Sequence, residues 1–151
     1  MTTTCEATAA PVAFSIGDEQ FLMAPLSELD YAELERWLQY RVIHLARGSL
    51  GPDVDAEMQR VTMEAAINLA SSLVWHSAEG LKATRTHEGT VQYLWLALRH
   101  NQPNITIARV KSLIADKANK LAMVDAFNLA NGFSAKKNEP APPLENAPAG
   151  Q

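Results

Sequence analysis

The sequence predicts a mainly α-helical protein, in which a small N-terminal β-hairpin precedes a bundle of about four to five helices between disordered termini. Three observations lead to this prediction. Residues 91–100 carry apolar side chains at helical spacing around most of their circumference. Residues 12–16 alternate between apolar and polar before a turn and a second apolar run at 20–23, and both chain ends lack periodicity. The expected division is a disordered N-terminus (1–11), one helical domain with its hairpin (12–133) and a disordered Pro-rich tail (134–151).

Residues 91–100 are predicted to form the central helix. Its apolar residues are Val91, Leu94, Trp95 and Leu98 on one face, with Tyr93, Leu96 and Ala97 beside that face. A helix that is apolar nearly all round is normally buried on several sides. We expect it to end before Pro103, because proline disfavours the helical conformation of the preceding residue. A second helix should begin after the N-cap residue Thr106 and bury Val110, Leu113 and Ile114.

The segments before the central helix predict a hairpin and two helices. Strands at residues 12–16 and 20–23 flank a turn, and two strands alone are marginally stable, so the hairpin should pack on helices or pair with another copy. Ser27 and Asp30 resemble a capping box and open a helix that runs to about Arg47. Its expected inner face comprises Leu34, Trp37, Leu38, Arg41, Val42 and Leu45, with Glu33, Glu35 and Arg36 outside and Gly48 just past its end.

The next helix is expected to begin near Pro52 and to run to about Trp75. Its predicted inner stripe comprises Val54, Met58, Val61, Ala65, Leu69 and Ser72. Residues 76–88 are predicted to be a polar connection, and Gly89 a hinge. A last helix should cover residues 116–131, with Leu121, Val124 and Phe127 on one side.

Composition and charge narrow the function classes. The 151-residue chain has room for a single core, and its formal net charge of −4 argues against nonspecific binding to nucleic acids or anionic membranes. Cys5 is the one cysteine, so no disulfide framework exists within one chain, and we expect a reducing compartment. No apolar run approaches the roughly 18 residues that span a membrane. The first residues lack the features of a secretory signal, so the protein is expected to stay where it is made.

Catalytic, metal and cofactor motifs are not recognisable in the sequence. The four histidines are not at zinc-protease spacing, and a single cysteine cannot start a zinc cluster. Residues 53–57 resemble the start of a calcium loop but lack the later glycine and glutamate of that loop. There is no Gly-rich phosphate loop and no G-x-S-x-G. We therefore expect no enzyme activity, no cofactor and no metal.

Aromatic residues are the candidates for binding a protein partner, because such residues dominate interface energetics. The candidate partner-binding residues are Phe21, Trp37, Trp75 and Tyr93. Core packing is the alternative for each, and we favour it for Trp95. Trp75 adjoins a polar segment, where exposure is more plausible.

Three segments between residues 14 and 133 carry a recognisable pattern. A strand, turn and strand at residues 14–21 precede Pro-Leu-Ser-Glu-Leu at 25–29, and Trp37 lies early in the first helix. Residues 93–114 then contain Tyr-Leu-Trp-Leu-Ala-Leu-Arg-His, Pro-Asn-Ile-Thr and Val-Lys-Ser-Leu-Ile. In these segments the chain resembles the tail assembly chaperones of siphophages and related prophages, whose pattern is W-L-A-L-(basic)-x-x-x-P-x-x-T followed by hydrophobic-x-x-L.

This resemblance implies a role in virion morphogenesis. Such chaperones bind the tape-measure protein, a very long helical chain, and keep it soluble before the tail tube polymerises round it. The implied partners are the tape-measure protein, the tail-tube protein and a frameshifted longer form of the chain itself, whose extension would join after Ser134. We also expect a homo-oligomer, a location in the host bacterial cytoplasm, and neither nucleic-acid nor membrane binding. A helical groove could cover an apolar stripe of the tape-measure helix.

The sequence is also compatible with two other hypotheses about function. Residues 98–114 could form a DNA-reading helix-turn-helix, with residues 106–117 as recognition helix, in a DNA-binding regulator. The acidic balance and the apolar inner stripe of that helix stand against this reading. A head–tail or baseplate structural component is the third possibility, and it would be found in purified virions, whereas an assembly chaperone would not.

Overall fold

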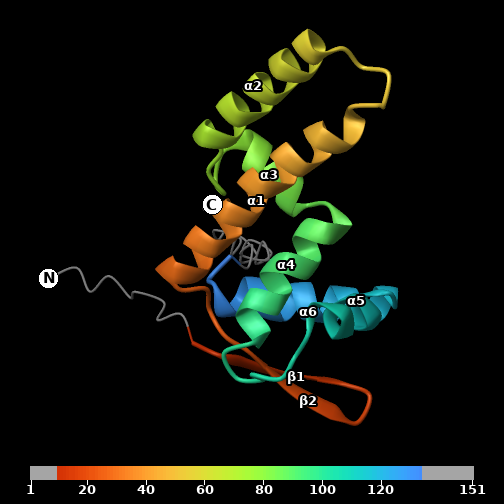
Figure 1. Cartoon of the computed structure of the whole chain (residues 1–151). Coiled ribbons are helices and arrows are strands. Elements are labelled where there is room, and N and C mark those ends of the chain that lie inside the picture. Colours follow the sequence, from red (N-terminus) through yellow and green to blue (C-terminus); the bar gives the residue numbers. More distant parts are fainter. Residues whose placement is uncertain (1–9, 134–151) are drawn as a thin grey trace, which may run out of the picture.

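The computed structural model describes residues 10–133, which form two strands and six helices (Figure 1). The elements are β1 (Val12–Ile16), β2 (Glu19–Met23), α1 (Glu28–Ser49), α2 (Ala56–Ser72), α3 (Ala78–Thr84), α4 (His87–Leu98), α5 (Ile107–Ile114) and α6 (Lys117–Ala130). The mainly helical class with an N-terminal hairpin is confirmed, although there is one helix more than predicted. Residues 1–9 and 134–151, which the sequence assigns to disordered termini, lie outside the described residues, as does Cys5.

The hairpin packs on helices. β1 and β2 pair in antiparallel register with Phe14 opposite Phe21, and the two rings stack with centroids 5.5 Å apart. Gly17 has a positive φ of 59° in the tight turn, a conformation that glycine adopts without steric cost. Phe21 and Met23 of β2 are buried, and the hairpin contacts α4 and α6. This contact supplies the apolar support that an isolated hairpin lacks.

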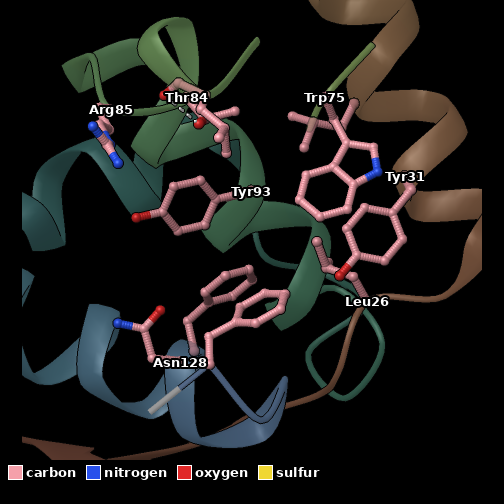
Figure 2. A pocket seen from close by; sticks show the side chains of 11 residues that line it. Leu26, Tyr31, Trp75, Thr84, Arg85, Tyr93 and Asn128 are labelled. Carbon is pink, nitrogen blue, oxygen red and sulfur yellow. Dashed lines mark hydrogen bonds between the residues drawn. The ribbon is translucent and has the colours of Figure 1, made fainter. Parts of the chain in front are cut away.

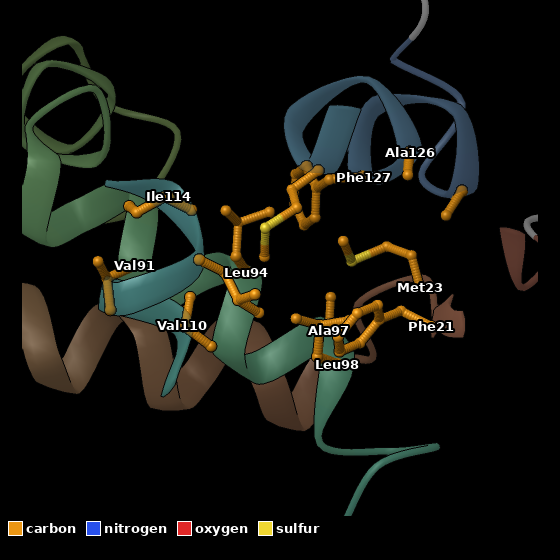
Figure 3. Packing of buried hydrophobic residues seen from close by; sticks show 13 residues of the cluster. Phe21, Met23, Val91, Leu94, Ala97, Leu98, Val110, Ile114, Ala126 and Phe127 are labelled. Carbon is orange, nitrogen blue, oxygen red and sulfur yellow. The ribbon is translucent and has the colours of Figure 1, made fainter. Parts of the chain in front are cut away.

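α4 is the central packing element, as predicted. It contacts α1, α3, α5, α6 and β2, and its Val91, Leu94, Leu96 and Leu98 are almost fully buried. Figure 3 shows the main cluster, in which side chains of α4, α5 and α6 meet Phe21 and Met23 of the hairpin. Trp95 is partly buried, and its indole N–H donates a hydrogen bond to the Ile105 carbonyl at 3.1 Å.

Side chains cap α5 and α6 at their N-termini. The Thr106 hydroxyl accepts from the Arg109 N–H at 3.1 Å, and the Asp116 carboxylate accepts from the Asn119 N–H at 3.0 Å. Such caps satisfy backbone donors that have no partner inside the helix. α5 buries Val110, Leu113 and Ile114, which confirms the predicted face.

α1 and α2 form a helical hairpin that projects from the rest of the molecule (Figure 1). Within the described chain, α1 is the one element that contacts α2. The predicted inner stripe of α2 is wrong, because Met58, Val61 and Leu69 are exposed and Ala66 and Ala70 are buried. Small side chains let two helices approach closely, so α2 turns its alanines toward α1 and leaves the larger residues outside.

The predicted limits and faces of these two helices also need correction. α2 begins after its N-cap Asp55 and ends at Ser72, earlier than Trp75. α1 continues through Gly48 to Ser49, and Leu45, assigned to its inner face, is exposed. The sequence assigns Glu33 and Glu35 to the outside, but both are half-buried and accept hydrogen bonds from other elements.

Candidate partner-binding groove

An apolar groove of about 210 Å³ opens between the start of α1, α3, α4 and the end of α6 (Figure 2). Its lining comprises Leu26, Tyr31, Leu34, Trp75, Leu81, Thr84, Arg85, Tyr93, Phe127, Asn128 and Phe133. Phe133 and Leu81 are 48% and 39% exposed, so the groove is open at its rim. Its volume is below the roughly 300–1,000 Å³ of small-molecule sites. The groove therefore suits a few side chains of a polypeptide.

Aromatic rings form two walls of this groove. Tyr31 and Trp75 stack with centroids 4.6 Å apart and planes 21° apart. The ring centroids of Tyr93 and Phe127 are 4.5 Å apart, and those of Phe127 and Phe133 are 6.3 Å apart. Figure 2 shows the Tyr31–Trp75 pair across from Tyr93. Ring faces give a binding site large apolar contact area at a small cost in side-chain entropy.

Two identical backbone corners place Trp75 and Tyr93. The first has Ser77 as N-cap of α3, whose hydroxyl accepts from the Gly80 N–H at 3.1 Å and donates to the Val74 carbonyl at 2.7 Å. In the second, the Thr86 hydroxyl accepts from the Gly89 N–H at 3.1 Å and donates to the Ala83 carbonyl at 2.6 Å. Both corners have the sequence Ser/Thr-x-Glu-Gly. Each corner caps the N-terminus of the next helix, α3 or α4.

Glycine is required in both corners by close approach of the backbone. A Cβ atom on Gly80 would lie 2.1 Å from the Val74 carbonyl oxygen, and one on Gly89 would lie 2.3 Å from that of Ala83. The predicted polar connection at residues 76–88 therefore contains α3. Gly89, predicted to be a hinge, is the third residue of α4 and is buried against the preceding turn.

Asp30 fixes the start of α1 against the end of α4. Its side chain is 1% exposed and completes the predicted capping box with Ser27, whose N–H and hydroxyl both donate to Oδ2 at 2.8 Å. The Arg99 guanidinium donates to Asp30 Oδ1 at 2.9 Å, and His100 Nε2 lies 2.7 Å from Oδ2. Arg99 also binds Glu33 through two hydrogen bonds and lies 4.8 Å from the Trp95 ring centroid.

The end of α6 forms the opposite rim of the groove. The Asn131 carboxamide accepts from the Leu26 N–H at 2.8 Å and donates to the Phe127 carbonyl at 2.9 Å. Gly132 has a φ of 71°, and the Phe133 N–H then donates to the Asn128 carbonyl at 2.7 Å. These bonds join the chain before α1 to the chain after α6 and keep Phe133 at the groove.

The groove carries little charge. Burial raises the pKa of the Tyr31 hydroxyl, and the nearby negative charge of Asp30 adds to this effect. Burial also raises the pKa of the Tyr93 hydroxyl. Because an ordinary tyrosine titrates near pH 10, both stay neutral at physiological pH. Arg85 is left as the charged side chain of the lining.

The structure brings two of the four candidate partner-binding residues together, Trp75 and Tyr93. Phe21 lies in the main core and is 6% exposed, so it is not available at the surface. Trp37 is half-buried at another site, where the Arg41 guanidinium lies 6.0 Å from its ring centroid and Lys111 lines the same shallow pocket.

Sequence reasoning missed the contribution of Leu26 and Tyr31 to the groove. The two residues occupy the position before the N-cap Ser27 and the fourth position of α1, where a hydrophobic staple is expected. That spacing could have identified both from sequence. Leu81 and Phe133 carry no comparable signal, because their place at the groove depends on how distant segments meet.

The described part of the chain shows no metal site and no membrane-spanning helix. Residues 10–133 contain no group of three or more His, Cys, Asp or Glu side chains placed to hold a metal ion. Among the described helices, none is long and apolar enough to cross a membrane. On the expected recognition helix α5, Arg109 binds Glu19 of the hairpin at 2.6 Å.

The chain was also compared with known proteins. No family model, curated protein or solved structure matches it.

Proposed function

We propose that this protein is a non-enzymatic tail assembly chaperone of a phage or prophage, and that its groove binds an apolar helical segment of the tape-measure protein. The carrying observation is the groove itself, which is open to solvent and lined by five aromatic rings with one charged residue. The resemblance of residues 14–133 to this family supplies the identity of the partner. The groove supplies a surface of the kind that such a partner needs.

The size and apolar lining of the groove are suited to weak, reversible binding of an apolar helix. An amphipathic helix places anchor side chains at i, i+3, i+4 and i+7, and such anchors bind apolar grooves. Burying one apolar side chain contributes about 1.5–3 kcal/mol, whereas association costs at least about 4 kcal/mol in lost freedom of motion. Two or three anchors in a groove of this size therefore give weak binding. Many copies along one long tape-measure chain would compensate through multivalency.

Further partners belong to the same proposal. These are the tail-tube protein, a frameshifted longer form of the chain and further copies of itself, all in the host bacterial cytoplasm. The exposed face of α2 with Met58, Val61 and Leu69, and the strand edges of the hairpin, are surfaces on which copies could associate. Binding to nucleic acids or membranes is not part of the proposal.

The alternatives gain no specific support from the described surface. α4, the turn and α5 have the order of a helix-turn-helix, but Arg109 on α5 is engaged by Glu19. Tight, salt-sensitive binding in a gel shift at low salt would favour the DNA-binding regulator over our proposal. Detection of the protein in purified virions would favour the head–tail or baseplate component.

Co-expression with the cognate tape-measure protein tests the proposal directly. We expect the tape-measure protein to move from the insoluble to the soluble fraction and to co-purify with this chain. The matched control is a chain with Trp75→Ser and Tyr93→Ser, provided that its circular dichroism shows an intact helical fold. An unchanged solubility without co-purification would reject the proposal.

A further inference from the structure

We infer that the groove binds the chain's own proline-rich segment, residues 140–144 (Pro-Ala-Pro-Pro-Leu), when no other partner is present. This inference rests on the groove as the peptide site of the proposed function, but it does not depend on the tape-measure protein being the partner. Its starting point is that Phe133, the last described residue, itself lines the groove. Everything that follows in the chain is therefore tethered at the rim.

The tether is long enough for this contact. From Phe133 to Pro140 the chain can extend by at most about 23 Å, at about 3.3 Å per residue. The groove has a volume of only about 210 Å³ and Phe133 is part of its lining, so a tether of this length can return the segment to the groove. A short tether gives an effective concentration of about 1 mM, which makes even a weak contact populated.

The chemistry of the groove matches that of proline. Pro-rich segments are recognised by aromatic-lined grooves, because proline rings pack on aromatic faces and their backbone loses little entropy on binding. Proline has a carbonyl acceptor but no N–H, so a Pro-rich segment needs hydrogen-bond donors from its site. Within residues 10–133, the Trp75 indole N–H and the Tyr31 hydroxyl donate no hydrogen bond to another described residue.

Charge complementarity supports the same occupant. Arg85 lines the groove and forms no ion pair with another residue of the described chain. Glu139 and Glu145 lie immediately before and after residues 140–144. Either carboxylate could pair with the Arg85 guanidinium while the apolar residues occupy the groove. The basic residues Lys136 and Lys137 belong to the connecting stretch, three or more residues before Pro140, whereas the two glutamates are adjacent to the segment.

The inference is tested on the full-length chain by ¹H–¹⁵N correlation NMR, with no tape-measure protein present. We expect P140A/P142A/P143A to shift the Trp75 indole N–H signal and the backbone signals of Leu81 and Phe133. The control P148A removes a proline outside the segment and should leave these signals in place. A synthetic peptide of residues 138–147 should bind the triple variant about tenfold more tightly than the wild type, because the tethered competitor is gone.

Two results would overturn the inference. The first is an identical spectrum for the triple variant and the wild type. The second is a shift that grows with protein concentration, which would assign the groove to the segment of a second copy. Normal co-purification of the tape-measure protein alongside either result would leave the proposed function standing, so the two failures can be told apart.

Discussion

Among single residues, Asp30 makes the polar contacts that join the start of α1 to the end of α4. Burial disfavours its charged form, but hydrogen bonds from the Ser27 backbone, His100, the Ser27 hydroxyl and Arg99 together outweigh burial and lower the pKa of Asp30 below its usual value. The carboxylate therefore joins the first turn of α1 to the end of α4. Tyr31, the next residue, stacks on Trp75 in the groove.

Replacement of Asp30 by asparagine should destabilise the fold. Asp30→Asn keeps the shape of the side chain but removes the charge that Arg99 and His100 face. Loss of one partner from a buried ion pair costs about 3–5 kcal/mol, and because Arg99 is partly exposed we expect about 2 kcal/mol here. Urea denaturation measures this loss. The control Asp55→Asn, at the exposed N-cap of α2, should change stability by less than about 0.5 kcal/mol, because asparagine caps equally well.

The lowered pKa of Asp30 also predicts how stability depends on pH. In the unfolded chain Asp30 titrates near the ordinary aspartate value of about 3.9. Below that pH the unfolded state binds a proton before the folded state does, so the contribution of Asp30 is complete above it and is lost as pH falls through the lower folded pKa. The free energy of unfolding should decline below about pH 4 more steeply for the wild type than for Asp30→Asn. Parallel profiles would contradict the assigned role.

At the scale of elements, the two Ser/Thr-x-Glu-Gly corners determine the path from α2 through α3 to α4. Each combines a hydroxyl cap with a glycine that packs on the preceding backbone. The repeated motif is visible in the sequence, but a polar segment with two glycines predicts a connection and a hinge. Periodicity could not reveal it, because α3 has only seven residues.

Alanine at either corner glycine should be poorly tolerated. In Gly80→Ala and Gly89→Ala the new Cβ meets backbone atoms that cannot move independently, so we expect a loss of at least about 2 kcal/mol in each. Gly48→Ala is the matched control, since Gly48 lies in α1 with open space around it. It should stabilise the protein by about 0.5 kcal/mol through higher helix propensity. Thermal denaturation distinguishes the two classes, and equal effects at all three glycines would refute the corner model.

The orientation of α2 makes a further prediction. Val61 is exposed and Ala66 is buried against the only described element that α2 contacts, α1. Val61→Ser should therefore change the unfolding free energy by less than about 0.5 kcal/mol, whereas Ala66→Leu should cost about 1–3 kcal/mol by overpacking. Denaturation of dilute protein measures both. A larger loss of stability in Val61→Ser than in Ala66→Leu would instead support the inner face that the sequence predicts for α2.

Across the molecule as a whole, the features that the sequence predicts correctly are those that depend on local sequence pattern. The hairpin, the helix start after Thr106 and the central position of α4 follow from alternation, a capping residue and all-round apolarity. The face of α2 did not follow, because periodicity favours large apolar residues and the packing selected Ala66 and Ala70.

The groove was only partly predictable for a different reason. Trp75 and Tyr93 could be singled out as aromatic candidates, but the sequence does not show that they meet Leu26 and Phe133. Phe21 and Trp37 have the same residue chemistry and lie elsewhere. Which aromatic residues share one surface depends on tertiary contacts between segments more than a hundred residues apart, such as the hydrogen bond from Leu26 to Asn131.

Binding at the groove is measured by the amount of cognate tape-measure protein that co-purifies with variants of its rim. We predict that Leu81→Ser combined with Phe133→Ser lowers recovery at least about tenfold, because two apolar contacts worth about 1 kcal/mol or more each are lost. Leu121→Ser, a similar change at a residue of α6 that is 62% exposed and outside the groove, should recover as much as the wild type. Equal recovery from the rim variant and the wild type would exclude the groove as the binding site.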